Sequence, residues 1–401
     1  MRRRFTTPSK NISPFSRRSF LQLSAAAAVF QVVTEPVLAA AARRKPFSKD
    51  GVMIDSNENP LGPSQSARDA ISAIIPMGGR YLDNLTEDLV NTFAQLEGLN
   101  PDHVHIFPGS SPPLRFAVVA FTSPQKSYVS ADPGYEAGFY AAAATQARVV
   151  KVPLTKTYAH DVKAMVAAAP DAGLFYICNP NNPSGTLTQH SDIEYLVENK
   201  PKGSIVMVDE AYIHFCDAPS SLDFIKAGKD VVVLRTFSKT YGMAGLRCGF
   251  AIARPELLEK ITDRSGRNFM PVTAVAAAAA SLKDPGLVPE RRRINAAVRQ
   301  ETFQWLDSNG YRYIPSESNC FLLDTKRPGK EVIDAMAEQN VFIGRIWPIM
   351  PTCVRITVGT HDEMQHFQSA LQKVMRGTTA FSVQPARQAV NVRRNRMFLP
   401  T

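Results

Sequence analysis

The sequence predicts an α/β fold: a large domain with a mostly parallel central sheet and helices on both faces, followed by a smaller α+β domain. Short, almost wholly apolar segments recur along the first two thirds of the chain, as strands buried on both faces of a sheet do. Helical patterns separate several of them, as crossovers between parallel strands require. After about Gly266 the helical patterns lengthen, which indicates a second region.

The expected strands of the large sheet are seven apolar segments: His103–Phe107, Ser127–Ser130, Arg148–Val152, Leu174–Cys178, Ile205–Val208, Val231–Leu234 and Cys248–Ala253. Helices are expected between them, among others at Ala137–Thr145 and Ser191–Lys200. The second region is expected to hold helices over Val272–Leu282 and Pro289–Ser308 and strands at Cys320–Leu323 and Val354–Val358.

The expected organisation has five parts. They are a leader (1–42), an N-terminal arm that joins the small domain (43–74), the large domain (75–265), the small domain (266–376) and a basic tail (377–401). The tail lacks clear periodicity and is expected to be poorly ordered.

The net charge lies mainly at the two ends of the chain. Of the formal +10, residues 1–42 carry +5 and residues 377–401 carry +4, which leaves about +1 for the body. The high isoelectric point is therefore no argument for nucleic-acid binding. Five widely spaced cysteines form no C-x-x-C pair, so neither a zinc site nor a redox pair is indicated, and no metal is expected.

The N-terminus resembles a twin-arginine (Tat) export signal. Arg17 and Arg18 are followed by Phe20 and by an Ala-rich apolar run, Leu23–Ala42. An acid and a proline interrupt this run, so it makes a poor membrane-spanning helix. We expect a periplasmic protein exported by the Tat machinery, or a cytoplasmic one if the leader is not functional.

Polar residues follow three of the apolar segments, where open α/β sheets bind ligands. Asn179–Gly185 (NPNNPSG) follows Leu174–Cys178 and exposes side-chain amides, although a simple turn has the same composition. Asp209 ends the next segment, where a carboxylate can hold a pyridine nitrogen protonated, and Tyr212 can hydrogen-bond a phenolic oxygen.

The third group follows Val231–Leu234. Lys239 lies among hydroxyl residues, and Arg247 follows eight residues later, which offers an amine nucleophile and an anion clamp. A fourth signal is Arg355, at the start of an apolar segment, which is either a surface residue or a carboxylate fork.

In this order, the groups resemble the site of fold-type I pyridoxal 5′-phosphate (PLP) enzymes, most closely the histidinol-phosphate aminotransferase family. Asp55–Pro63 and Arg80–Asp83 are similar to that family's N-terminal arm and tyrosine motif. The resemblance covers about residues 50 to 372. It implies a PLP-dependent transaminase (EC 2.6.1.-) that exchanges an amino group between an amino acid, or an amino-alcohol phosphate, and a 2-oxo acid.

The resemblance also implies roles for individual residues. Lys239 carries PLP as a Schiff base and moves a proton between the substrate α-carbon and C4′ of the cofactor. Asp209 pairs with the pyridinium nitrogen, and Asn182 and Tyr212 hydrogen-bond the ring oxygen O3′. Tyr135 stacks on the ring face.

The phosphate of the cofactor is expected to be bound by Ser238 and Arg247, helped by the backbone N–H groups of Ser110 and Ser111. The family usually has Gly-Ser-Asp-Glu where this chain has Gly109–Pro113 (GSSPP). Proline suits the first turn of a helix, and a helix N-terminus still attracts an anion, so the cofactor is still expected to bind.

The substrate contacts implied by the resemblance are Arg355, for an acidic group, with Tyr81, Asn59 and Arg345. Tyr81 is expected to reach the site of a neighbouring subunit, which makes a homodimer the expected catalytic unit. For Arg345, a surface role remains equally open. The cofactor residues leave open another PLP reaction on the same scaffold: decarboxylation, elimination, racemisation or cyclisation.

Overall fold

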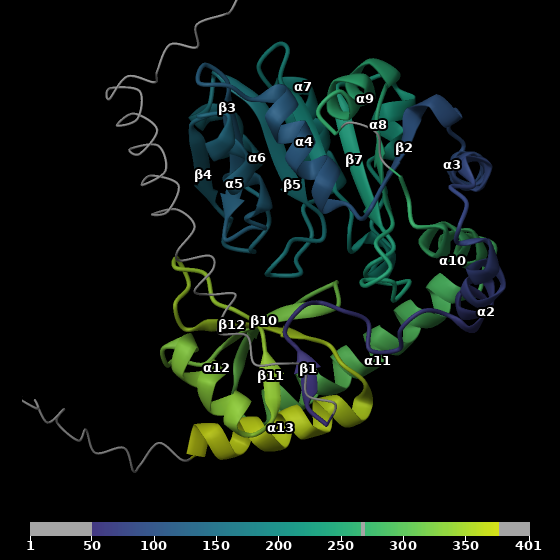
Figure 1. The fold of residues 1–401 in the computed structure, drawn as a ribbon. Coiled ribbons are helices and arrows are strands. Elements are labelled where there is room, and N and C mark those ends of the chain that lie inside the picture. The colour runs from purple at the N-terminus through teal and green to yellow at the C-terminus, as the bar shows by residue number, and fades with distance from the viewer. Residues whose placement is uncertain (1–49, 266–268, 377–401) are drawn as a thin grey trace, which may run out of the picture. The chain divides into compact units, whose positions relative to one another are not determined.

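The structure is a computed structural model that describes residues 50–265 and 269–376. Its helices and strands lie within one compact unit that begins at Val52 (Figure 1). The expected export signal at 1–42 and the tail at 377–401 lie outside the described residues. No described helix is both long and apolar enough to cross a membrane.

The large sheet has the order β2-β8-β7-β6-β5-β3-β4 in the described part of the chain. Its strands are β2 (Val104–Phe107), β3 (Ser127–Asp132), β4 (Val149–Pro153), β5 (Ala172–Cys178), β6 (Ile205–Asp209), β7 (Val231–Thr236) and β8 (Gly249–Ile252). The pairs from β4 to β7 are parallel, and only β8 runs antiparallel to its neighbours among these strands. The predicted mostly parallel sheet is thus confirmed.

Helices cover both faces of this sheet, and alternate strand residues enter different cores (Figure 1). Phe175 and Val208 belong to a core shared with α2 (Gln65–Ile74), α3 (Asp83–Glu97), α6 (Val162–Ala168), α7 (His190–Asn199), α8 (Leu222–Lys226) and α10 (Val272–Leu282). Tyr176 and Met207 belong to the opposite core, shared with α4 (Ser111–Phe121), α5 (Ala137–Ala144) and α9 (Pro255–Thr262). Because both faces of β5 and β6 are covered, these two central strands are almost wholly apolar.

A second group of elements surrounds a third core, which includes Phe321 and Val354. Its strands form an antiparallel sheet of β9 (Arg312–Ile314), β10 (Cys320–Asp324) and β12 (Cys353–Thr357), and a parallel pair of β1 (Val52–Ile54) and β11 (Val341–Ile343). Its helices are α11 (Leu287–Ser308), α12 (Gly329–Glu338) and α13 (His361–Arg376). The β1–β11 pair joins the N-terminal arm to the C-terminal region.

Short 3-10 helices complete the described structure: η1 (Ile75–Met77), η2 (Pro101–His103) and η3 (Ile213–Phe215). The neighbouring strands β5, β6 and β7 end close together, since Cys178 pairs with Asp209 and Asp209 with Leu234. The polar segments after these strands therefore start from one edge of the sheet, as the sequence predicts.

Candidate active site

Lys239 lies in the loop that follows β7 and is half-buried. Its Nζ donates a hydrogen bond to the carbonyl oxygen of Ser56 over 3.4 Å and lies 5.6 Å from the ring centroid of Tyr212. Burial, together with the nearby Arg355 guanidinium, lowers the pKa of Lys239 to about 8. A larger neutral fraction of the amine, which is the nucleophilic form, is therefore present near neutral pH.

Asp209 ends β6 and is 4% exposed. Its Oδ2 accepts a hydrogen bond from the Tyr176 hydroxyl over 2.9 Å, and its Oδ1 accepts one from the Ala211 N–H over 3.1 Å. Burial raises the pKa of Asp209 to about 6, against these two hydrogen bonds, which favour the anion. The result is a buried carboxylate held in one orientation by its neighbours.

Tyr176 is a site residue that the sequence analysis did not identify. It lies inside the apolar segment Leu174–Cys178, which predicts a core side chain. The one sequence feature that indicates a polar contact here is the tyrosine hydroxyl, because a buried tyrosine normally forms a hydrogen bond with its hydroxyl group.

Tyr212 and Asn182 bring a phenol and an amide close to Lys239 and Arg355. The Tyr212 hydroxyl accepts a hydrogen bond from Asn57 Nδ2 over 3.0 Å, and burial raises the pKa of the phenol well above its usual range. Asn182 Oδ1 accepts from Arg355 over 2.9 Å, which leaves the amide NH2 of Asn182 for another acceptor. Both residues are buried.

Arg247 and Ser238 meet in the loop after β7. Arg247 Nη1 donates to Ser238 Oγ over 3.3 Å and Nη2 donates to the Pro108 carbonyl oxygen over 3.2 Å. A Cβ at Gly109 would lie only 2.2 Å from Arg247 Nη2. Only glycine therefore lets the backbone approach the guanidinium this closely, and its φ of +91° also suits glycine.

The start of α4 supplies further donors at this end of the site. Ser110 is its N-cap and Ser111 its first residue, with proline in the first turn, as the sequence predicts. Ser111 Oγ lies 3.3 Å from the hydroxyl of Tyr135. A helix N-terminus beside an arginine and serine hydroxyls provides the donors that a phosphate group requires.

Arg355 projects from β12 and is 7% exposed. Besides its contact with Asn182, its Nη2 donates to the Asp55 carbonyl oxygen over 2.6 Å. Its Nε has no hydrogen-bond partner among the described residues, although it is buried. Burying a guanidinium N–H without a partner costs free energy, and an anion that accepts from this N–H would remove that cost.

Arg345 lies nearby but differs from Arg355 in its surroundings. Its side chain is 46% exposed and forms an ion pair with Glu136 over 2.8 Å. Both arginines lie over the ring of Trp347, at 4.7 Å for Arg345 and 5.8 Å for Arg355. Trp347 is buried, and its Nε1 donates to the Gly134 carbonyl oxygen over 2.9 Å. Trp347 thus lies beside two arginines, of which Arg355 is buried and Arg345 is partly exposed and paired with Glu136.

The other two predicted substrate residues occupy different positions. Asn59 donates from Nδ2 to the carbonyl oxygen of Thr240, next to Lys239, over 2.9 Å. Tyr81 is 72% exposed and its ring packs against Phe269, with 4.7 Å between the centroids. The structure therefore places Asn59 beside Lys239 and Tyr81 at the surface.

The site residues match the chemical groups of PLP. An amine with a lowered pKa suits its aldehyde, and the buried Asp209 carboxylate suits its ring nitrogen. The phenol of Tyr212 and the amide of Asn182 suit its phenolic oxygen. Arg247 and Ser238, with the start of α4, suit its phosphate. The aldehyde, ring nitrogen, phenolic oxygen and phosphate of PLP thus each have at least one candidate partner among the described residues.

The chain is similar to known aminotransferases along most of its length. The family model for aminotransferase class I and II matches residues 49–371. The chain is 33% identical to a histidinol-phosphate aminotransferase of Moorella thermoacetica, over 82% of this chain and 86% of the relative. A second such enzyme, of Symbiobacterium thermophilum, is 34% identical over 81% of this chain and 91% of the relative.

A solved structure shows the same similarity in three dimensions. The histidinol-phosphate aminotransferase of Sinorhizobium meliloti, in complex with pyridoxal 5′-phosphate, superposes with a TM-score of 0.74 at 27% identity. It covers 81% of this chain and 90% of that one. These matches extend over both groups of elements described above. The chain belongs to the aminotransferase class I and II family and uses pyridoxal phosphate as its cofactor.

Proposed function

We propose that this transaminase takes its amino group from a donor that carries a carboxylate or a phosphate, which Arg355 binds. The observation that carries the proposal is the buried guanidinium of Arg355. One of its N–H groups has no partner in the part of the chain that the structure describes, and its neighbour Asn182 also belongs to the proposed cofactor site. The relatives named above are histidinol-phosphate aminotransferases, which supports an amino-alcohol phosphate as donor; an amino acid is the other candidate.

The bound cofactor supplies an aldehyde that condenses with amines and a ring that accepts electrons from the bond that breaks at the substrate α-carbon. In the proposed mechanism Lys239 would hold the cofactor through Nζ and would act as the base that moves a proton between the substrate α-carbon and C4′. The lowered pKa of Lys239 suits this role, because a base is most effective when its pKa lies near the working pH.

The other residues hold the reacting groups in place. Asp209 keeps a negative charge against the ring nitrogen, while Tyr212 and Asn182 donate to the phenolic oxygen. Tyr135 covers the ring face. Ser238 and Arg247 bind the phosphate, with the backbone N–H groups of Ser110 and Ser111 at the start of α4. Asn59 and Arg345 are proposed to help Arg355 with the substrate.

We also propose that the catalytic unit is a homodimer in which Tyr81 completes the partner's site. Several large side chains between residues 61 and 81 are exposed, which favours their burial against another protein. Their exposed fractions are 39% for Leu61, 60% for Ile75, 47% for Met77 and 72% for Tyr81.

The leader residues support export to the periplasm. The paired arginines Arg17 and Arg18 are the feature that the Tat machinery would recognise. Replacing both by lysine keeps the charge but should leave the precursor in the cytoplasm, measured by fractionation. Undiminished export of the double variant would refute this part of the proposal.

The donor is tested with purified holoenzyme and no acceptor. A true donor should discharge the visible absorbance of the bound cofactor in one half-reaction, and a 2-oxo acid should then restore it. The panel should contain amino acids, amino-alcohol phosphates and simple amines that lack an acidic group. If the simple amines discharge the band as fast as the acidic donors, Arg355 does not select the substrate.

A further inference from the structure

The N-terminal segment Asp55–Asn57, which follows β1, contacts three groups of the site. The carbonyl oxygen of Asp55 accepts from Arg355, and that of Ser56 accepts from Lys239. Asn57 is 1% exposed and reaches Tyr212 with its side chain. Its φ of 53° lies in the left-handed region, which asparagine tolerates better than most residues.

The orientation of the Asn57 amide follows from its contact with Thr357. The Thr357 hydroxyl accepts from the backbone N–H of Asn57 over 2.9 Å and donates to Asn57 Oδ1 over 3.1 Å. Because Oδ1 is engaged there, Nδ2 faces the other way. It donates to the Tyr212 hydroxyl over 3.0 Å and to Cys320 Sγ over 3.1 Å.

This orientation decides the direction of the Tyr212 hydrogen bond. An amide nitrogen only donates, so the phenol oxygen must accept from Asn57. The single proton of the phenol is then left for another acceptor, and no described residue accepts it. A reversed amide would present Oδ1 to Tyr212 and take up that proton.

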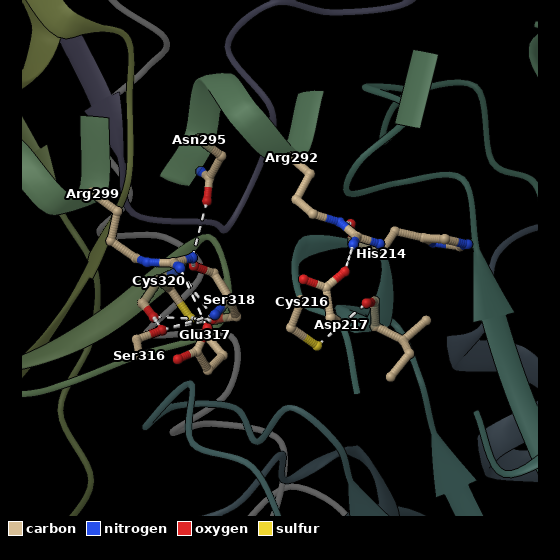
Figure 2. A network of polar contacts seen from close by, with 11 residues as sticks. His214, Cys216, Asp217, Arg292, Asn295, Arg299, Ser316, Glu317, Ser318 and Cys320 are labelled. Carbon is tan, nitrogen blue, oxygen red and sulfur yellow. Dashed lines mark hydrogen bonds and ion pairs between the residues drawn. The ribbon is translucent and has the colours of Figure 1, made fainter. Parts of the chain in front are cut away.

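Both partners of Asn57 Nδ2 are supported from α11. Figure 2 shows Arg292 reaching the segment after Tyr212, where it donates to the His214 carbonyl oxygen over 2.9 Å and pairs with Asp217. On the same helix, Arg299 donates to the Ser318 carbonyl oxygen over 2.8 Å, two residues before Cys320 (Figure 2). These contacts hold the backbone next to the two acceptors without involving Asn57.

We infer that Asn57 is a positioning residue that keeps Tyr212 a hydrogen-bond donor toward the phenolic oxygen of the cofactor. The inference rests on the proposed function, because it takes Tyr212 as the partner of that oxygen. Asn57 itself does not touch the cofactor; it acts through Tyr212. Thr357 is the residue that keeps the Asn57 amide from reversing.

The test is a double-mutant cycle with Asn57→Gly and Tyr212→Phe. Glycine removes the amide without charge and suits the left-handed backbone. The readouts are the dissociation constant of PLP from the protein and the pH midpoint at which the absorbance of the bound cofactor changes. Thr357→Val, which keeps the β-branched shape of a strand residue, provides a second and milder route to the same effect.

Asn57→Gly should weaken PLP binding about tenfold or more, the size of one lost hydrogen bond to a charged group. It should also raise the pH midpoint, because a donor to the phenolic oxygen favours the deprotonated cofactor. With Tyr212→Phe already present, Asn57→Gly and Thr357→Val should each change the PLP dissociation constant less than about twofold and should leave the pH midpoint in place. The reason is that the effects of coupled residues are not additive.

Equal changes in both backgrounds would overturn the inference, because they would show a structural effect that does not pass through Tyr212. Unchanged values for both variants with Tyr212 intact would overturn it as well. A wild-type protein without PLP at Lys239 would instead contradict the proposed function. The two failures are therefore distinguishable.

Discussion

The hydroxyl of Tyr176, on β5, donates a hydrogen bond to Asp209 Oδ2, at the end of the adjacent β6, over 2.9 Å. The two strands are paired in parallel, and both side chains are almost wholly buried. Burial alone would favour a protonated carboxyl group, and this hydrogen bond works in the opposite direction. Tyr176 therefore favours the anionic form of Asp209 and fixes its orientation, as the proposed contact with the ring nitrogen of the cofactor requires.

Tyr176→Phe should lower kcat about tenfold, since a hydrogen bond to a charged group contributes about 1.5–3 kcal/mol. Without the hydroxyl the pKa of Asp209 rises, and the carboxylate holds the ring nitrogen protonated less well. The matched control is Tyr128→Phe, on β3, because Tyr128 is equally buried and the Asp209 carboxylate takes its tyrosine hydrogen bond from Tyr176 instead. Equal losses in the two variants would show that Tyr176 contributes only packing.

Arg355→Lys keeps the positive charge but loses the planar fork and the contact with Asn182. KM for an anionic donor should rise about 10- to 100-fold, from the loss of one or two charge-assisted hydrogen bonds. Arg345→Lys serves as the comparison and should change KM less than about threefold, because Arg345 is half-exposed and already paired with Glu136. Steady-state kinetics of both variants decide this, and a larger effect at Arg345 would reverse the assignment.

The rate at which the apoprotein captures PLP should rise with pH, with a midpoint near the pKa of Lys239, about 8. The rate rises with pH because only the neutral amine attacks the aldehyde, and the amine of Lys239 is mostly neutral above its pKa. Arg355→Met should move the midpoint to higher pH, because the Arg355 charge is one of the causes that lower the Lys239 pKa. Stopped-flow absorbance measures this; a midpoint that stays in place would exclude electrostatic coupling between the two residues.

The shared site is tested by mixing two inactive variants. Lys239→Ala removes the cofactor anchor, and Tyr81→Ala removes the exposed ring that is expected to act in the partner's site. If each site takes its Lys239 from one chain and its Tyr81 from the other, mixed dimers contain one intact site. Activity should then recover after subunits exchange. No recovery, in a mixture shown by mass spectrometry to contain mixed dimers, would place Tyr81 outside the partner's site.

Local patterns in the sequence predicted the strands of the large sheet and the polar residues that lie at or after the ends of β5, β6 and β7. These residues could be placed because parallel strands that end at one edge bring their following loops together. The predicted strand ends differ from the observed ones by one or two residues, as for Leu174–Cys178 and the observed Ala172–Cys178. Such ends depend on hydrogen-bond partners in other strands, which the local pattern does not contain.

The contacts that could not be predicted join residues far apart in the chain. Asn57 lies 155 residues from Tyr212 and 300 from Thr357, and no local signal connects them. The three-residue strands β1 and β11 are likewise defined by their pairing with each other, which joins an N-terminal and a C-terminal segment of the described chain and leaves no local pattern. The ion pair of Arg345 with Glu136 is of the same kind, and it distinguishes Arg345 from Arg355 where their sequence contexts do not.

Lys239 is the residue proposed to carry the cofactor in this aminotransferase. Reduction of the holoenzyme with borohydride fixes PLP to the amine that holds it, and peptide mass spectrometry then locates the label. The label should be found on Lys239 in the wild-type protein, and Lys239→Ala should carry none and show no turnover. Labelling of a different lysine, or turnover in Lys239→Ala, would contradict the account.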